Sequence, residues 1–130
     1  GVSINAISVP SGVEFYVSGD VSASGTVTGG SDDRFKGAKV DLTNVLDKIR
    51  DLDTFEYSWN DDVPRGVIFE DDGTTRRRYI GVSAQQLEVE YPALASESDG
   101  MYGVQYNRLV PVLLAAIQEL EARVAVLEAQ

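Results

Sequence analysis

Residues 107–129, NRLVPVLLAAIQELEARVAVLEA, carry the pattern that decides the fold. Two apolar series run through this stretch at seven-residue spacing, the second three residues behind the first, which is the a/d seam of a coiled coil. A helix packed only on its own domain is the alternative. Because the seam reaches the end of the printed sequence with nothing after it to cover it, we expect self-association. The first series is Val110, Ile117 and Val124, and the second is Leu113, Leu120 and Leu127.

The residues around the seam add two expectations. Glu119, Glu121 and Arg123 alternate in charge, which is typical of a solvated outer face. β-branched residues in the first series with Leu in the second favour two strands in simple coiled coils. The seam alone therefore predicts association, but it does not predict three chains.

The segments before this helix predict a small mixed domain of the α+β class. Residues 41–52 carry apolar side chains at helical spacing, and Asp41 or Thr43 is placed to cap that helix. Residues 84–90 predict a second, shorter helix that ends before Pro92, because the residue preceding a proline disfavours helical geometry.

Extended segments alternate with these helices. Residues 54–59 have period two, and residues 101–105 predict one more strand. Residues 66–70 and 77–82 flank an Asp-Gly turn at Asp72, which predicts a hairpin. The strand over 54–59 places three large aromatic side chains on one face, and we expect this face to fill the core. Its aromatic residues are Phe55, Tyr57 and Trp59.

Residues 1–30 differ in composition from the rest. They hold only two charged residues, Glu14 and Asp20, and are rich in Gly, Ser, Val and Thr. Residues 13–17 alternate as a strand does, and residues 19–30 predict short strands broken by glycine turns. Such strands stack with copies from neighbouring chains, although a flexible linker is the alternative. We expect a β-rich stalk over 1–30 and a domain boundary at Ser31, where charge rises abruptly.

Composition excludes several classes of function. The net charge of −10 argues against a nucleic-acid partner, because phosphate binding requires clustered basic residues. The basic run Arg76-Arg77-Arg78 follows an acidic turn and favours a charged hairpin over an anion site. The absence of histidine and cysteine excludes a Ser-His-Asp triad, disulfides and the common zinc ligands. No apolar run approaches the roughly 20 residues of a membrane helix, so we expect no membrane, metal or cofactor partner.

Ser31 and Lys36 are the candidate catalytic residues, and they lie at the composition boundary. A serine hydroxyl is a poor nucleophile unless a base takes its proton. Without histidine, a lysine can be that base where burial or nearby positive charge favours its neutral form. Arg34 would favour the neutral amine, whereas Asp32 and Asp33 would oppose it if they faced Lys36. By spacing alone, such a pair is typical of turn residues rather than of a catalytic site.

Several blocks in order along residues 31–130 resemble the C-terminal intramolecular chaperone domain of phage endosialidases, neck appendages and tail fibres. That family consists of autoproteolytic Ser–Lys peptidases. The opening pattern Ser-Asp-x-Arg-x-Lys and a closing block before the last helix are its most specific parts. The matching residues are Ser31, Asp32, Arg34 and Lys36, then 45–52, 57–60, 81–87 with Tyr91-Pro92, 99–106 and 109–120.

The resemblance implies roles for these residues. Ser31 would be the nucleophile and Lys36 the general base of a single-turnover self-cleavage. The C-terminal helices, about 107–129, would bundle three copies into a homotrimer that aligns the stalk of residues 1–30, its folding client. The chaperone would then be released, leaving a fibre or tailspike on the virion that is assembled in the bacterial cytoplasm. No cofactor is implied.

The scissile bond has two alternatives. Within one chain, attack by Ser31 on the preceding carbonyl closes a five-membered ring and cuts Gly30–Ser31, and small Gly29 and Gly30 would allow a tight approach. Attack between copies would cut Ser31–Asp32 instead.

Three other functions are alternatives to the self-cleaving chaperone. They are a non-cleaving structural fibre tip, a receptor-binding tip that uses loops in 61–78, and a processing domain of a transcription factor, for which no DNA-binding module is present.

Overall fold

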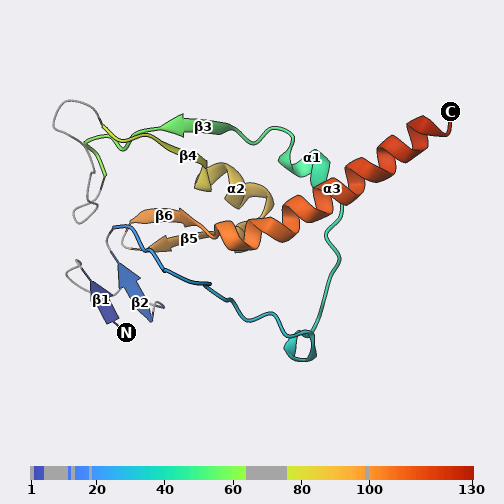
Figure 1. Cartoon of the computed structure of the whole chain (residues 1–130). Helices are drawn as coiled ribbons and strands as arrows, with labels where there is room; N and C mark the ends of the chain where they lie inside the picture. The colour runs from blue at the N-terminus through green and yellow to red at the C-terminus, as the bar shows by residue number, and fades with distance from the viewer. Residues whose placement is uncertain (1, 5–11, 13, 18, 64–75, 99) are drawn as a thin grey trace.

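The computed structural model describes residues 2–4, 12, 14–17, 19–63, 76–98 and 100–130. These residues form a small mixed α/β domain from which a long C-terminal helix projects, as Figure 1 shows, so the expected α+β class is confirmed. The strands pair into three two-stranded sheets. The elements are β1 (Val2–Ile4), β2 (Phe15–Val17), η1 (Asp33–Phe35), α1 (Val45–Ile49), β3 (Thr54–Tyr57), β4 (Tyr79–Val82), α2 (Ala84–Glu90), η2 (Pro92–Leu94), β5 (Ala95–Ser98), β6 (Met101–Val104) and α3 (Tyr106–Glu128).

The N-terminal segment has less sheet than expected. β1 and β2 pair in parallel, with Val2 opposite Phe15. Residues 19–30, all of which the structure describes, form no strand, so the prediction of short strands there is wrong for the single chain. The physical reason is that a strand needs a partner for its backbone groups, and this segment runs extended with every residue exposed.

Helix α1 is shorter than the predicted helix over 41–52. Asn44 precedes it in the left-handed conformation, with φ of 53°, and makes no side-chain cap. The predicted caps Asp41 and Thr43 are therefore wrong, because the chain changes direction at Asn44. The cap comes instead from α3, where the two carboxylate oxygens of Glu119 each accept a hydrogen bond at 2.8 Å from the amides of Val45 and Leu46.

Helix α2 has the predicted bounds, which confirms that prediction. The Ser83 hydroxyl caps it by accepting a hydrogen bond from the Gln86 amide at 3.2 Å, and the chain leaves it through Tyr91 and Pro92. The Gln86 side chain then exchanges two hydrogen bonds with Asp53, which lies between α1 and β3. Helix α2 is thus capped by its own preceding residue and is joined to the first half of the domain through Gln86.

The second arm of the predicted hairpin pairs with an earlier strand. β4 lies antiparallel to β3, with Phe55 opposite Gly81 and Tyr57 opposite Tyr79. The first arm, 66–70, and its turn lie outside the described residues. The predicted strand over 101–105 is present as β6, and it forms a hairpin with β5, which the sequence pattern did not indicate.

The core lies where the helices meet. It consists of side chains from α1, α2, η2 and α3, so the expectation that the aromatic face of β3 fills the core is wrong. Phe55 is 39% exposed, and its neighbours on that face are only half-buried, because this face borders an open cavity. The buried core residues are Val45, Leu87, Leu94, Val112 and Ala116.

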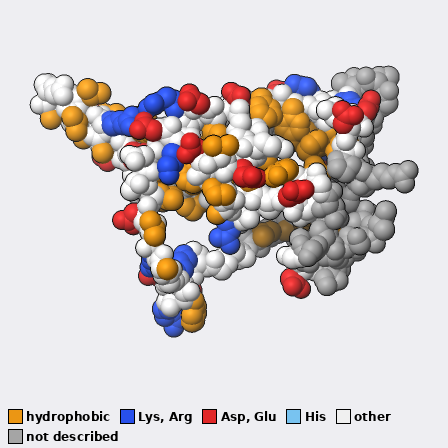
Figure 2. All heavy atoms as spheres, turned by 180° about the vertical axis from the view of Figure 1, so that it is seen from behind, with side chains coloured by type: hydrophobic (Ala, Val, Ile, Leu, Met, Phe, Trp, Pro, Cys, Tyr) orange, Lys and Arg blue, Asp and Glu red, His pale blue; other side chains and the backbone are white. Residues whose placement is uncertain are grey.

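Helix α3 packs on the domain with a face other than the seam. Val112 and Ala116 are buried, whereas all six seam residues are exposed, Ile117 by 64%. Figure 2 shows hydrophobic side chains along the projecting end of this helix, at the upper left of the view. Glu119 lies on the packed face because it caps α1, so its predicted place on a solvated outer face is wrong. The exposed seam leaves a continuous apolar stripe that the single chain does not cover.

Candidate active site

The candidate catalytic residues lie in an extended arm between the N-terminal strands and α1. Every residue from 19 to 44 is exposed. Figure 1 shows the arm swinging away from the body to a turn at η1 and returning to α1 beside α3. Apolar side chains stand uncovered on it, including Phe35 at 81% and Val40 at 88% exposure. An arm of this kind makes few contacts with its own domain and presents its side chains outward.

A capped turn gives the arm its local structure. The Asp32 carboxylate accepts a hydrogen bond at 3.0 Å from the Arg34 amide, which caps η1. The Phe35 amide donates to the Asp32 carbonyl and the Lys36 amide donates to the Asp33 carbonyl, at 3.2 and 3.3 Å. This single turn of 3₁₀ helix reverses the chain between Ser31 and Lys36.

The turn brings the two candidate residues into contact. Lys36 Nζ donates a hydrogen bond to Ser31 Oγ across 2.7 Å. That distance lies within the range a general base needs to take a proton from a nucleophile. When the amine is neutral, the same contact lets the hydroxyl donate its proton to the nitrogen.

Both acidic residues of the motif are engaged by other cations. The Arg34 guanidinium donates two hydrogen bonds to the Asp32 carboxylate, at 2.9 and 3.2 Å. These bonds, followed by the one from the Arg34 amide, hold the pKa of Asp32 below its usual value. Lys39 Nζ contacts Asp33 Oδ1 at 2.5 Å. The charge on Lys36 is therefore not neutralised by its nearest carboxylates in sequence.

Both candidate scissile bonds are accessible. Gly30, Ser31 and Asp32 are exposed, and a side-chain carbon built at Gly29 or Gly30 would meet no atom within 4 Å. In the single chain, nothing therefore presses against these glycines. Exposure of Gly30, Ser31 and Asp32 leaves the backbone on both sides of Ser31 accessible in the single chain.

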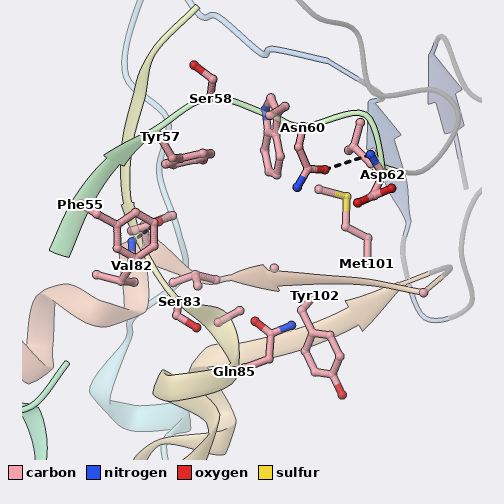
Figure 3. Close-up of a pocket in the computed structure, with 17 residues that line it drawn as sticks. Phe55, Tyr57, Ser58, Asn60, Asp62, Val82, Ser83, Gln85, Met101 and Tyr102 are labelled. Carbon is pink, nitrogen blue, oxygen red and sulfur yellow. Dashed lines mark hydrogen bonds between the residues drawn. The ribbon is translucent and has the colours of Figure 1, made fainter. Parts of the chain in front are cut away.

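A second concave region lies away from the arm. A cavity of about 640 Å³ opens between β3 with its following loop and the β5–β6 hairpin. In Figure 3, Phe55 and Tyr57 lie on one side of it, and Met101 and Tyr102 lie on the other. Tyr57 packs edge-on against Trp59, with ring centroids 5.3 Å apart. The cavity is lined mainly by apolar and aromatic side chains and contains neither Ser31 nor Lys36.

The three arginines of the basic run form ion pairs, which favours a charged segment over an anion site, although the turn and first arm of the expected charged hairpin lie outside the described residues. Arg76 pairs with Asp61, Arg77 with Asp20 and Arg78 with Glu56. Among the described residues, no group of three acidic side chains is placed to hold a metal ion, and no helix is long and apolar enough to cross a membrane.

Comparison with known families adds to this geometry. Residues 31–96 match the model of the Peptidase_S74 family, described as chaperone of endosialidase. The match begins at Ser31 and covers about half of the chain. The chain belongs to this family. No curated protein matches the chain.

Membership of the chaperone of endosialidase family indicates the general function of this chain. It gives this chain a domain of a serine peptidase-like family with a chaperone role for phage tail proteins. The matched residues include the capped turn, α1, the β3–β4 sheet and α2. The two C-terminal blocks of the resemblance, at 99–106 and 109–120, lie outside the matched range.

Sequence reasoning missed two contacts at or beside the site. The Lys39–Asp33 pair spans six residues in a loop, where no periodic pattern predicts contact. The Glu119 cap of α1 joins residues more than 70 positions apart. A signal for the first was present only as an alternation of acidic and basic residues in the arm.

Proposed function

We propose that this chain is a trimerisation chaperone of a phage tail fibre or tailspike that releases itself by cutting its own backbone at Ser31. Ser31 is the nucleophile and Lys36 the general base. The observation that carries the proposal is the 2.7 Å contact between Lys36 Nζ and Ser31 Oγ in a member of a self-cleaving family. Lys36 is the residue of the motif found in contact with the hydroxyl, and the chain has no histidine to serve as the base.

Cleavage within one chain proceeds as an acyl shift followed by hydrolysis. Ser31 Oγ attacks the Gly30 carbonyl carbon through a five-membered ring while its proton passes to Lys36. The Ser31 nitrogen takes a proton as the C–N bond breaks, which leaves an ester between Gly30 and Ser31 Oγ. Water then hydrolyses the ester, giving a Gly30 carboxylate and a free Ser31 amine.

Cleavage between copies is the second route. Attack by Ser31 on its own carbonyl would need a four-membered ring, so cutting Ser31–Asp32 requires the hydroxyl of a neighbouring copy. The exposed arm reaches outward and is accessible to such an attack. The two routes differ in the first residue of the released fragment, which is Ser31 in one and Asp32 in the other.

Trimerisation is proposed for the exposed seam of α3. Three copies would bury this stripe around a common axis and hold the three chains of residues 1–30 in register. Aligning three separate strands carries a large loss of entropy, and a trimeric clamp at residues 31–130 removes most of that cost before the stalk forms. Release of the clamp then leaves a stalk whose unfolding has no low-barrier path, so the mature fibre on the virion is kinetically stable.

Intact mass tests the cleavage. Purified wild type should lose about thirty N-terminal residues after folding, because the cut lies at Ser31. Ser31→Ala and Lys36→Ala should remain whole. Lys36→Arg is the matched control, because it keeps the positive charge but cannot act as a base at ordinary pH. The mass of the C-terminal fragment identifies which bond is cut.

A wild type that stays whole under folding conditions would overturn the peptidase proposal. The same outcome would leave a non-cleaving structural fibre tip as the function. If the Lys36→Ala variant is still cut, self-cleavage stands, but Lys36 is not its base.

A further inference from the structure

The arm contains more charge than its two candidate catalytic residues need. Between residues 31 and 43 the charged side chains are Asp32, Asp33, Arg34, Lys36, Lys39 and Asp41. A carboxylate close to an ammonium group stabilises its charged form, so either Asp32 or Asp33 facing Lys36 would keep the amine protonated and inactive as a base. Asp32 and Asp33 could therefore each prevent Lys36 from acting as the base.

The contacts in the arm keep these carboxylates away from the base. Arg34 binds both carboxylate oxygens of Asp32 through one guanidinium edge, Nε and Nη2, and Lys39 binds Asp33. Within the described part of the chain, Lys36 has no ion pair, and the contact found for its Nζ is Ser31 Oγ. Within residues 31–43 the ion pairs found join only residues of this segment, and Asp41 enters none of those described.

From this geometry we infer that Arg34 and Lys39 are positioning residues that occupy Asp32 and Asp33, so that Lys36 can give up its proton and act on Ser31. The inference rests on the proposed Ser–Lys self-cleavage and deepens it. Asp32 has a second task, because its carboxylate also caps the turn that brings Lys36 to Ser31. Lys39 has no such structural task in the turn, which makes it the cleaner position for a test.

The experiment measures the rate of self-cleavage against pH in full-length protein. Lys39→Gln frees Asp33 to approach Lys36. The rate should then reach half of its maximum at a pH higher by up to about one unit, which is about a tenfold slower cut at fixed pH below that midpoint. Lys39→Arg should keep the wild-type midpoint, because it keeps a cation on Asp33. Lys48→Gln removes the same charge far along the chain and should leave the midpoint unchanged.

The rescue variant separates this role from a structural one. Asp33→Asn with Lys39→Gln removes both members of the pair, so the midpoint should return to that of the wild type. At Arg34, Arg34→Gln should raise the midpoint, and adding Asp32→Asn should restore it, since Asn still caps the turn. Raising the salt concentration should shrink each shift, because the pairs are exposed and screened.

The outcomes are distinguishable. Wild type that does not cut would overturn the proposed function, and this inference would fail with it. Wild type that cuts through Ser31 and Lys36, with the same midpoint in Lys39→Gln and Arg34→Gln, would overturn the inference alone. A lower rate at every pH with no change in midpoint, or no rescue by Asp33→Asn, would show that Lys39 acts only on the fold of the arm.

Discussion

At the scale of single residues, Glu119 links the two ends of the domain. Helix α1 has five residues, too few to be stable by itself, and Asn44 before it offers no side-chain cap. The Glu119 carboxylate supplies the missing acceptors for the first two amides of α1. These two backbone hydrogen bonds, that of Leu46 first, lower the pKa of Glu119, and the nearby Asp47 charge opposes the shift. One carboxylate on α3 thus fixes the point at which the arm enters the domain.

We expect Glu119→Gln to lower the thermal midpoint of unfolding by several degrees at neutral pH. An amide has one acceptor oxygen, and its nitrogen would face an N–H group of α1. Because the folded-state pKa of Glu119 is lowered, its stabilisation is present above the usual value of 4.5 and is lost as the pH falls through the folded value. The deficit of the variant should therefore shrink in acid. Thermal unfolding in a Ser31→Ala background measures both.

Glu121→Gln is the matched control for this prediction. It makes the same change two residues further along α3, at an exposed position. Its thermal midpoint should follow that of the parent protein at every pH. Equal effects of the two variants would mean that net charge, rather than the cap of α1, explains the loss at Glu119.

At the scale of elements, the start of α3 supports the β3–β4 sheet. The Tyr106 hydroxyl at the first turn of α3 accepts a hydrogen bond at 3.3 Å from the Val82 amide at the end of β4. It lies over Gly81, where a side-chain carbon would come within 2.8 Å of the Tyr106 oxygen and 3.2 Å of a Tyr57 ring carbon. Gly81 is therefore needed for the close approach of helix and sheet.

Gly81→Ala should destabilise the protein by about 1–3 kcal/mol, because the new methyl group forces Tyr106 and Tyr57 apart. Gly103→Ala is the control, since its nearest neighbour is the Ser96 hydroxyl at 3.8 Å, an ordinary contact. That variant should be neutral or slightly stabilising. Urea unfolding of both variants in the Ser31→Ala background gives the two free energies. A cost at Gly81 no larger than that at Gly103 would contradict the packing argument.

At the scale of the whole molecule, the described part of the single chain leaves apolar side chains uncovered on two features that bear on assembly. One is the seam of α3, and the other is the arm with Phe35 and Val40. An extended arm and a projecting helix bury little apolar surface within one chain. Association with further copies would bury more of that surface.

Ile117→Lys should reduce the oligomer to monomer or weaken its association by at least tenfold. The lysine would stand in the middle of the seam, where burial of a charge without a partner is costly. Gln118→Lys places the same charge beside the seam and should associate as the parent does. Sedimentation equilibrium over a range of concentrations measures both, and an unchanged oligomer in Ile117→Lys would place the interface elsewhere.

The sequence predicted those parts of the fold that depend on local signals. Helix α2 was found with its bounds because Ser83 and Pro92 mark its two ends, and the seven-residue repeat of α3 is visible without any partner. Helix α1 was too long in the prediction, because its start depends on Asn44 and on a carboxylate 74 positions from Val45. The aromatic face of β3 was wrongly predicted to lie in the core, because period-two alternation shows which residues share a face but not whether another element covers that face.

The candidate site divides in the same way. Ser31 and Lys36 could be proposed only with the family resemblance, because residue type and spacing alone are typical of turn residues. The Asp32 cap between them was not among the expectations. The partner of Asp33 could not be predicted, since Lys39 reaches it through loop geometry that has no repeat. The exposure of Ser31 and Lys36 in the single chain could not be predicted either, because it depends on tertiary packing around the arm, which local sequence patterns do not indicate.

The exposed arm has a consequence for the time before assembly. Digestive proteases bind extended, accessible backbone, and those of the trypsin type cut after basic residues such as Arg34, Lys36 and Lys39. A newly made chain with this arm uncovered is therefore open to degradation by the proteases of the host cell before it assembles into the proposed trimer. Because that assembly requires two partners, it would depend steeply on concentration, so slow synthesis would favour degradation and rapid local synthesis would favour survival. The arm thus makes the yield of finished fibres depend on how fast chains are produced relative to how fast they are destroyed.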